Sequence, residues 1–270
     1  MWQDDITESF IMGKSGDEGQ CEDVLVACEH FYAVIDGVTS KFPVKYEGKT
    51  AGRYCAELLA REISSLDKDA DAITALEALD MAVKKAYGNS EITLENKMQA
   101  CVIIYSKARR EVFNYGDCGL MINGTFMDHS KKIDSLMQEL RSFTVMAYLN
   151  EGGGEDDLYE KDVGREAILA FLKKQSVFAN KDGYFGYPVI DGTGINKSLI
   201  KTYSLKQGDK VVLASDGYPK LFSSLKESEE YLEFVLKNDP LSIKENMQTK
   251  MKSRESLSFD DRTYISFTVK

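Results

Sequence analysis

The stretch that decides the fold is KVVLASDG, residues 210–217, an apolar run that ends on an Asp-Gly step. A second run of the same design, FYAVIDG, covers residues 31–37. About five consecutive apolar residues bounded by turn signals are typical of a buried β-strand. Each predicted strand delivers a carboxylate, Asp36 or Asp216, at its end. Buried strands that end in acids are one way in which a fold places hard oxygen ligands around a metal ion.

An Asp-Gly step alone carries little information, because it is a very common turn dipeptide. Asp182-Gly183 lies in a polar stretch and Asp191-Gly192 follows Pro188, so both are predicted to be ordinary turns. Asp36 and Asp216 differ because further acids stand at other predicted strand edges of the same chain. Those acids are Glu22-Asp23 before residues 24–28, Asp117 within residues 115–119, and Asp260-Asp261 before residues 264–269.

Hydrophobic periodicity predicts strands that bracket pairs of helices, a pattern typical of a layered α+β fold. The predicted strands cover residues 5–12, 23–36, 98–106, 110–116, 119–127 and 264–269. The predicted helices cover residues 48–66, 71–87, 131–149, 161–174, 224–236 and 240–252. Asp71 is a suitable cap for the second helix. The acidic, glycine-rich residues 151–157 are interpreted as a linker or mobile loop.

Composition excludes several function classes. The formal net charge of −10 argues against a nucleic-acid or membrane-surface partner, since both favour basic patches. The sequence lacks the run of about eighteen apolar residues that a transmembrane helix needs, and its first residues are acidic where a signal peptide is basic. Five cysteines, an odd number without CxxC spacing, suggest reduced thiols and a cytoplasmic protein.

Two other catalytic chemistries are disfavoured by the residues present. Cys55 and Arg61 have the spacing of the phosphate loop of a cysteine phosphatase, but both lie within the helix predicted over residues 48–66, where such a loop is not expected. Two histidines, His30 and His129, are too few for a histidine zinc site, and His129 is expected in a solvated turn.

Taken in order, the acidic motifs resemble those of the metal-dependent PPM (protein phosphatase 2C) family. The resemblance rests on Glu22-Asp23, Asp36-Gly37, Gly116-Asp117-Cys118, the ASDG motif at residues 214–217, and Asp260-Asp261-Arg262-Thr263. It spans the chain from about residue 5 to the C-terminus. It implies a four-layer α-β-β-α sandwich, with two antiparallel sheets between helical layers. It also implies one domain over residues 1–270, with a variable flap at about 150–200.

The resemblance further implies a ligand set for two or three Mn²⁺ or Mg²⁺ ions. The implied metal ligands are Glu22, Asp23, Asp36, Gly37, Asp117, Asp216 and Asp260. Of these, Asp36, Asp216 and Asp260 are the implied catalytic residues. Asp36 is expected to bridge two ions with help from the Gly37 carbonyl, and Asp117 to serve an additional, weaker site.

Two departures from the family pattern concern the phosphate. The family usually places an arginine four residues before the Glu of the Glu-Asp pair, where this chain has Glu18. The basic residues that could substitute for it are Lys14, Lys41, Arg53 and Arg262, and the sequence does not choose among them. Residues 38–40 also lack the histidine that some members use as a general acid.

Three functional classes remain open. The first is a metal-dependent phosphatase in which a metal-bridging water attacks a phosphate monoester, either phosphoserine or phosphothreonine on a protein or a small phosphoester. A Ser/Thr kinase acting on the same substrate is then the implied partner. The second is a pseudophosphatase, a regulatory domain that keeps the fold without turnover. The third is an unrelated metal hydrolase with a coincidental acid pattern.

Overall fold

The structure is a computed structural model that describes residues 5–270, apart from the side chain of Glu18. Two five-stranded antiparallel sheets form its centre. The first sheet has the order β1 (Ile6–Met12), β12 (Arg262–Thr268), β11 (Lys210–Ala214), β8 (Gly119–Ile122) and β9 (Thr125–Met127). The second has the order β10 (Lys201–Ser204), β7 (Glu111–Tyr115), β6 (Ala100–Ser106), β3 (Phe31–Gly37) and β2 (Val24–Ala27). A small hairpin joins β4 (Lys45–Tyr46) to β5 (Lys49–Thr50).

The two strands that end in Asp-Gly are buried on both faces, which explains their continuous apolar runs. In β3, Tyr32 and Val34 pack between the sheets, whereas Phe31, Ala33 and Ile35 face the opposite side. In β11, likewise, alternate residues enter the core between the sheets and a second cluster on the outer face of the first sheet.

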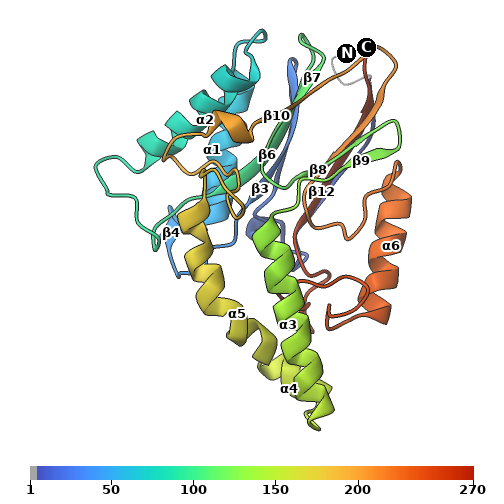
Figure 1. The fold of residues 1–270 in the computed structure, drawn as a ribbon. Helices are drawn as coiled ribbons and strands as arrows, with labels where there is room; N and C mark the ends of the chain where they lie inside the picture. The colour runs from blue at the N-terminus through green and yellow to red at the C-terminus, as the bar shows by residue number, and fades with distance from the viewer. Residues whose placement is uncertain (1–4) are drawn as a thin grey trace.

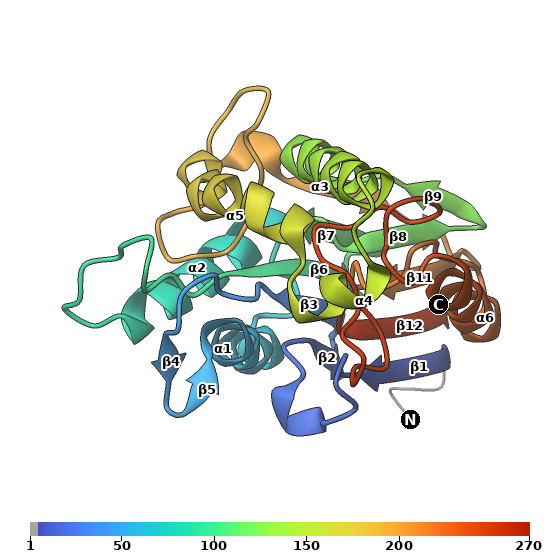
Figure 2. The same cartoon turned by 90° about the horizontal axis from the view of Figure 1, so that it is seen from below.

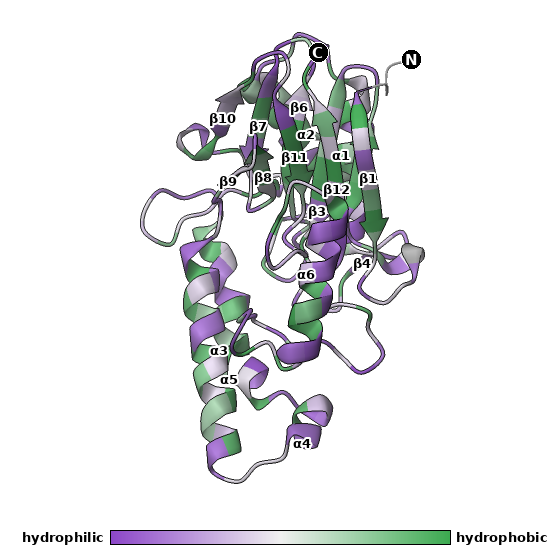
Figure 3. Cartoon of the chain, turned by 90° about the vertical axis from the view of Figure 1, so that its right-hand side faces the viewer, coloured by the Kyte–Doolittle hydropathy of each residue, from purple (hydrophilic) through white to green (hydrophobic). Residues whose placement is uncertain are grey.

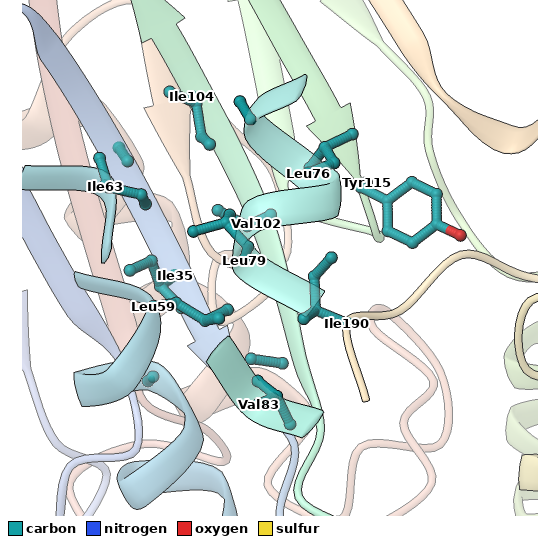
Figure 4. Packing of buried hydrophobic residues seen from close by; sticks show 14 of the residues in the cluster. Ile35, Leu59, Ile63, Leu76, Leu79, Val83, Val102, Ile104, Tyr115 and Ile190 are labelled. Atoms are coloured by element: carbon teal, nitrogen blue, oxygen red, sulfur yellow. The ribbon is translucent and has the colours of Figure 1, made fainter. Parts of the chain in front are cut away.

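Helices flank both sheets, as Figure 2 shows. The outer face of the second sheet is covered by α1 (Ala51–Ser65) and α2 (Ala72–Ala86), which pack Leu59, Leu76 and their neighbours against Ile35 and Val102 (Figure 4). Beside the first sheet lies α6 (Leu225–Asn238), whose first residue packs near Phe10 of β1. The expected layered α+β fold with two antiparallel sheets between helices is therefore confirmed.

Three helices project from one end of the sandwich, α3 (Lys132–Asn150), α4 (Glu155–Glu160) and α5 (Val163–Lys174) (Figures 1 and 3). Short 3-10 turns lie at Glu18–Gln20, Gln175–Phe178 and Lys197–Leu199. The projection begins before the flap expected at about 150–200, and the division of residues 1–270 into one domain with that flap stays a prediction. None of the helices in the described part of the chain is long and apolar enough to cross a membrane.

Most predicted elements lie within a few residues of the observed ones, and Asp71 caps α2 through the Thr74 N–H. The helix predicted over residues 240–252 is wrong, because this segment has no helix. The buried Asp239 carboxylate accepts the N–H groups of Ile243, Lys244 and Asn246, so a side chain competes with the helical backbone pattern.

Two turn interpretations also need correction. The linker expected at residues 151–157 ends early, since α4 begins at Glu155 with three acids in its first turn, where the helix dipole favours them. The turn expected at Asp191-Gly192 is present, with Gly192 at a φ of 80°, but its aspartate is buried. Its side chain is fully buried, and its carboxylate pairs with Lys97 at 2.8 Å and accepts the Thr193 N–H at 3.0 Å.

Arg141 of α3, the largest fully buried side chain among the described residues, holds the 240–252 segment in place. Its Nη1 donates to the carbonyl oxygens of Leu241, Ser242 and Gln248, at 3.0, 3.1 and 3.2 Å. Its Nε donates to Asp162 at 2.9 Å. One guanidinium therefore joins α3, the start of α5 and a loop that lines the candidate site.

We expect Arg141→Met to lower the free energy of unfolding by about 3–5 kcal/mol, because it leaves a carboxylate and three carbonyls without their cation. Urea unfolding measures this loss. Arg61→Met, an exposed position on α1, is the control and is expected to change stability by less than about 0.5 kcal/mol. Equal losses in both variants would contradict the assigned role of Arg141.

Candidate metal centre

Four of the predicted acids line one cavity of about 150 Å³ at the end of the sandwich from which the helices project. They are Asp36 at the end of β3, Asp117 between β7 and β8, Asp216 after β11, and Asp260 before β12. Gly37 lines the same cavity. Both sheets contribute strand ends here, so residues separated by more than two hundred positions become neighbours.

The glycines of the two motifs are required by close packing, and neither has a positive φ. A Cβ on Gly37 would lie 2.5 Å from the carbonyl oxygens of Glu22 and Gly52, and one on Gly217 would lie 2.0 Å from that of Asp261. By contrast, Gly183 and Gly192 have φ of 115° and 80°, the left-handed backbone of turns. The two classes of Asp-Gly step therefore differ in physical role.

Glu22 and Asp23 lie beside the cavity but do not line it. Asp23 is buried and accepts a hydrogen bond from Thr263 Oγ1 at 2.9 Å. Glu22 accepts the hydroxyl of Thr39, a cavity residue, and its Oε1 is a buried atom without a partner among the described residues. Glu22 and Asp23 are therefore better placed to hold neighbouring side chains of the site in position than to contact a bound ion directly.

Asp36 and Asp216 are the two cavity acids without a direct ion-pair partner among the described residues, although Lys131 and Lys250 partly offset the charge of Asp216. Neither carboxylate has a hydrogen bond or an ion pair within residues 5–270, Glu18 side chain excluded. Burial, followed by the charges of Asp216 and Asp23, raises the pKa of Asp36 well above its usual range. Burial, followed by the charge of Asp117, raises the pKa of Asp216 to about 7.

Three lysines compensate the other acids. Lys131 Nζ lies 2.6 Å from Asp117, Lys250 Nζ lies 2.7 Å from Asp260, and Lys14 Nζ lies 3.3 Å from Asp260. Although burial opposes it, Lys131 lowers the pKa of Asp117, and Lys250 with Lys14 lowers that of Asp260. Lys131 and Lys250 were missed at the sequence level because neither stands next to an acidic motif.

The residues fit a divalent cation at one place. Carboxylates are the hard oxygen donors that Mg²⁺ and Mn²⁺ prefer, and Asp36 and Asp216 offer two that form no ion pair within the described part of the chain. No group of three or more Asp, Glu, His or Cys side chains in the described chain is arranged to hold a metal ion. The donor set therefore favours a cation at Asp36 and Asp216, with Asp117 and Asp260 already paired to lysines.

The four basic residues proposed for the phosphate occupy different places. Arg53 donates to the carbonyl oxygens of Cys21 and Asp23, and Arg262 pairs with Glu229 at 2.8 Å, so neither lines the cavity. Lys14 pairs with the acids at the cavity edge, whereas Lys41 lines the cavity itself. The cavity also contains Arg165 of α5, which the sequence interpretation did not include.

His129 is partly buried, so the solvated turn expected for it is wrong. Its Nδ1 lies 2.7 Å from the carbonyl oxygen of Cys118, and its Nε2 lies 2.8 Å from the hydroxyl of Tyr203. It lines a second cavity of about 610 Å³, which shares Asp117 and Asp216 with the first. These contacts give His129 a structural role next to the acids.

We expect the protein treated with EDTA to lose stability as pH rises from about 5 to 8. Burial raises the pKa of Asp23 to about 8 and that of Asp216 to about 7, so the folded chain holds protons that the unfolded chain releases. That stabilisation is complete below the ordinary carboxyl pKa of about 4 and is lost as pH passes through the raised values.

The melting temperature across this pH range measures the effect. Asp216→Asn is expected to flatten the decline because the amide does not titrate. Glu233→Gln, on the exposed side of α6, is the control and is expected to leave the decline unchanged. A melting temperature that rises with pH in the wild type would contradict the charge assignment.

Comparison with known proteins yields structures only. No protein-family model and no curated protein matches the chain. Its structure is similar to that of the serine/threonine phosphatase PstP/Ppp from Mycobacterium tuberculosis, with 13% identity, a TM-score of 0.50 and 97% of each chain covered. It is also similar to Stp1 from Staphylococcus aureus, with 12% identity, a TM-score of 0.49 and coverage of 97% of this chain and 94% of that one. A further similar structure is the catalytic domain of PstP in complex with 2 manganese ions, with 13% identity, a TM-score of 0.48 and coverage of 97% and 96%.

Sequence identities this low show that the fold is shared, but they do not show a shared activity or substrate. The match to PstP/Ppp extends over nearly the whole length of both chains, and both sheets with their flanking helices fall within it. The chain therefore has the fold of the PPM-type serine/threonine phosphatases.

Proposed function

We propose that this chain is a phosphatase that hydrolyses phosphate monoesters with the help of Mn²⁺ or Mg²⁺. The observation that carries the proposal is the pair Asp36 and Asp216, two carboxylates that line one cavity and form no hydrogen bond or ion pair among the described residues. The fold, which is that of known serine/threonine phosphatases, favours phosphoserine or phosphothreonine on a protein as the substrate. A kinase that phosphorylates the same protein is then the expected partner.

In this proposal Asp36 and Asp216 hold the cation, and the Gly37 carbonyl is a further oxygen donor at the same strand end. When bound, the cation supplies a Lewis acid that polarises the phosphoryl group and promotes ionisation of a water molecule. Asp260 acts through Lys250 and Lys14, which it holds at the cavity. Glu22 accepts a hydrogen bond from Thr39, and Asp23 accepts one from Thr263, so both acids hold residues next to the cation site in place.

A location in the cytoplasm fits this function. All five cysteines are free thiols, four of them buried, as expected for a protein in a reducing compartment. The net charge of −10 agrees with a phosphoprotein partner better than with nucleic acid or an anionic membrane.

A second candidate function is supported by the lysines. Because Lys131 and Lys250 already neutralise Asp117 and Asp260, the fold has less need of metal ions to balance its acids. A regulatory domain that binds a phosphorylated partner without turnover has the same requirements for fold and charge. The two candidates differ only in catalysis.

Hydrolysis of para-nitrophenyl phosphate and of a phosphothreonine peptide, with Mn²⁺, Mg²⁺ or EDTA, tests the first proposal. We expect turnover that EDTA abolishes and that Asp36→Asn or Asp216→Asn lowers by a factor on the order of 100 or more, because each removes a charged donor to the cation. Asp182→Asn, at an exposed Asp-Gly turn, is the matched control and is expected to keep full activity.

Full activity in both Asp36→Asn and Asp216→Asn would refute the site assignment. No turnover by the wild type, combined with calorimetric binding of Mn²⁺ that Asp36→Asn removes, would instead favour the regulatory domain.

The number of ions is a separate prediction. We expect Lys131→Met to increase the amount of Mn²⁺ bound, because it frees the Asp117 carboxylate and leaves it without a cation. Equilibrium dialysis with metal analysis measures this directly. Lys132→Met, at the neighbouring exposed position, is the control and is expected to bind as much Mn²⁺ as the wild type. Unchanged binding in Lys131→Met would show that Lys131 does not exclude an ion.

A further inference from the structure

Two positively charged side chains in the acidic cavity lack a carboxylate partner. Lys41 and Arg165 both line it, and neither forms an ion pair within the described residues. Lys41 Nζ donates to the carbonyl oxygen of Thr39 at 2.6 Å, and Arg165 Nη1 donates to that of Thr249 at 2.9 Å. These contacts orient the two groups, and the other guanidinium donors of Arg165 have no acceptor among the residues that the structure describes.

These cations lie close enough to repel one another. Burial, followed by the positive charges of Arg165 and Lys250, lowers the pKa of Lys41 to about 8. Burial also lowers the pKa of Arg165. Unlike Lys41 and Arg165, Lys250 is paired, at 2.7 Å from Asp260. Asp260 attracts both cations but forms no ion pair with either, so part of their repulsion remains, and a bound anion would reduce it.

The positions of both groups are determined by structural contacts. Arg165 belongs to the first turn of α5, whose N-cap Asp162 accepts the Arg165 N–H at 2.8 Å and is in turn held by the buried Arg141. Lys41 belongs to the loop that follows β3, five residues after Asp36. The projecting helices and the strand end that carries the central acid therefore each contribute one cation to the same cavity.

We propose that Arg165 and Lys41 form the anion-binding site of this cavity and hold the phosphate group of the substrate. A guanidinium offers parallel N–H donors that match two phosphate oxygens, and an ammonium adds a point charge. The site rests on the proposed phosphatase function for its substrate but not for its existence, since a non-catalytic domain could bind phosphate in the same way. It supplies, from α5, the arginine that the family pattern leads one to expect before Glu22.

Calorimetric titration of the Mg²⁺-loaded protein with inorganic phosphate tests the site directly. We expect Arg165→Met to raise the Kd for phosphate by about tenfold or more, since a bidentate, charge-assisted contact is lost. Arg165→Lys is expected to lose less, because it keeps the charge without the fork. Lys41→Met is expected to weaken phosphate binding as well. Lys174→Met, an exposed position on the same helix, is the control and is expected to match the wild type.

A titration of each variant with Mn²⁺ separates an effect on phosphate from damage to the metal site or the fold. We expect Arg165→Met and Lys41→Met to bind Mn²⁺ as the wild type does. In a turnover assay Arg165→Met is expected to raise KM for para-nitrophenyl phosphate more than it lowers kcat.

Two results would overturn the inference: a wild type that does not bind phosphate measurably, or a phosphate Kd that stays within twofold of the wild type in both Arg165→Met and Lys41→Met. Failure of the proposed function looks different. In that case phosphate binding depends on Arg165 and Lys41 although no variant and no wild-type sample turns over substrate.

Discussion

The rest of the site depends on one electrostatic constraint, the close approach of Asp36 and Asp216, which end two buried strands and form no ion pair among the described residues. Burying a carboxylate without a partner is costly, and two close together are more so. Their raised pKa values record this cost. A divalent cation removes it, and a protonated pair is the alternative when no cation is bound. Charge balance among these groups therefore determines the arrangement of the cavity.

The sandwich provides the rigidity that this arrangement requires. Both strands have apolar side chains on two faces, so neither can shift without disturbing a packed cluster. Gly37 and Gly217 let neighbouring backbone approach the strand ends more closely than any side chain would allow. At the open side of the cavity, Arg141 and Asp239 hold a loop with no regular secondary structure, and that loop delivers Lys250. The sheets therefore fix the positions of the acidic side chains. Buried hydrogen bonds and ion pairs fix the positions of the basic side chains.

The cations in the cavity fall into two groups with different physical consequences. Lys14, Lys131 and Lys250 pair with carboxylates and reduce the negative field that an incoming phosphate meets. Lys41 and Arg165 have no such partner in the described part of the chain and are therefore available to an anion. The cavity therefore combines donors for a metal ion with donors for a phosphate. A phosphatase needs both, and a phosphate-binding regulatory domain needs at least the second.

The sequence by itself determined the layered α+β class, because strand and helix periodicity are local properties of the chain. The convergence of Asp36, Asp117, Asp216 and Asp260 was implied by the resemblance of the ordered acidic motifs to the PPM family, and periodicity did not predict it. The sequence interpretation failed at residues 240–252, where the Asp239 side chain satisfies backbone N–H groups that helix periodicity assigns to a helix. It also could not find Lys131, Lys250 or Arg165, which lie outside every acidic motif. Only the tertiary structure decided which cations meet which acids, because ion pairing depends on distance in space and carries no signature along the chain.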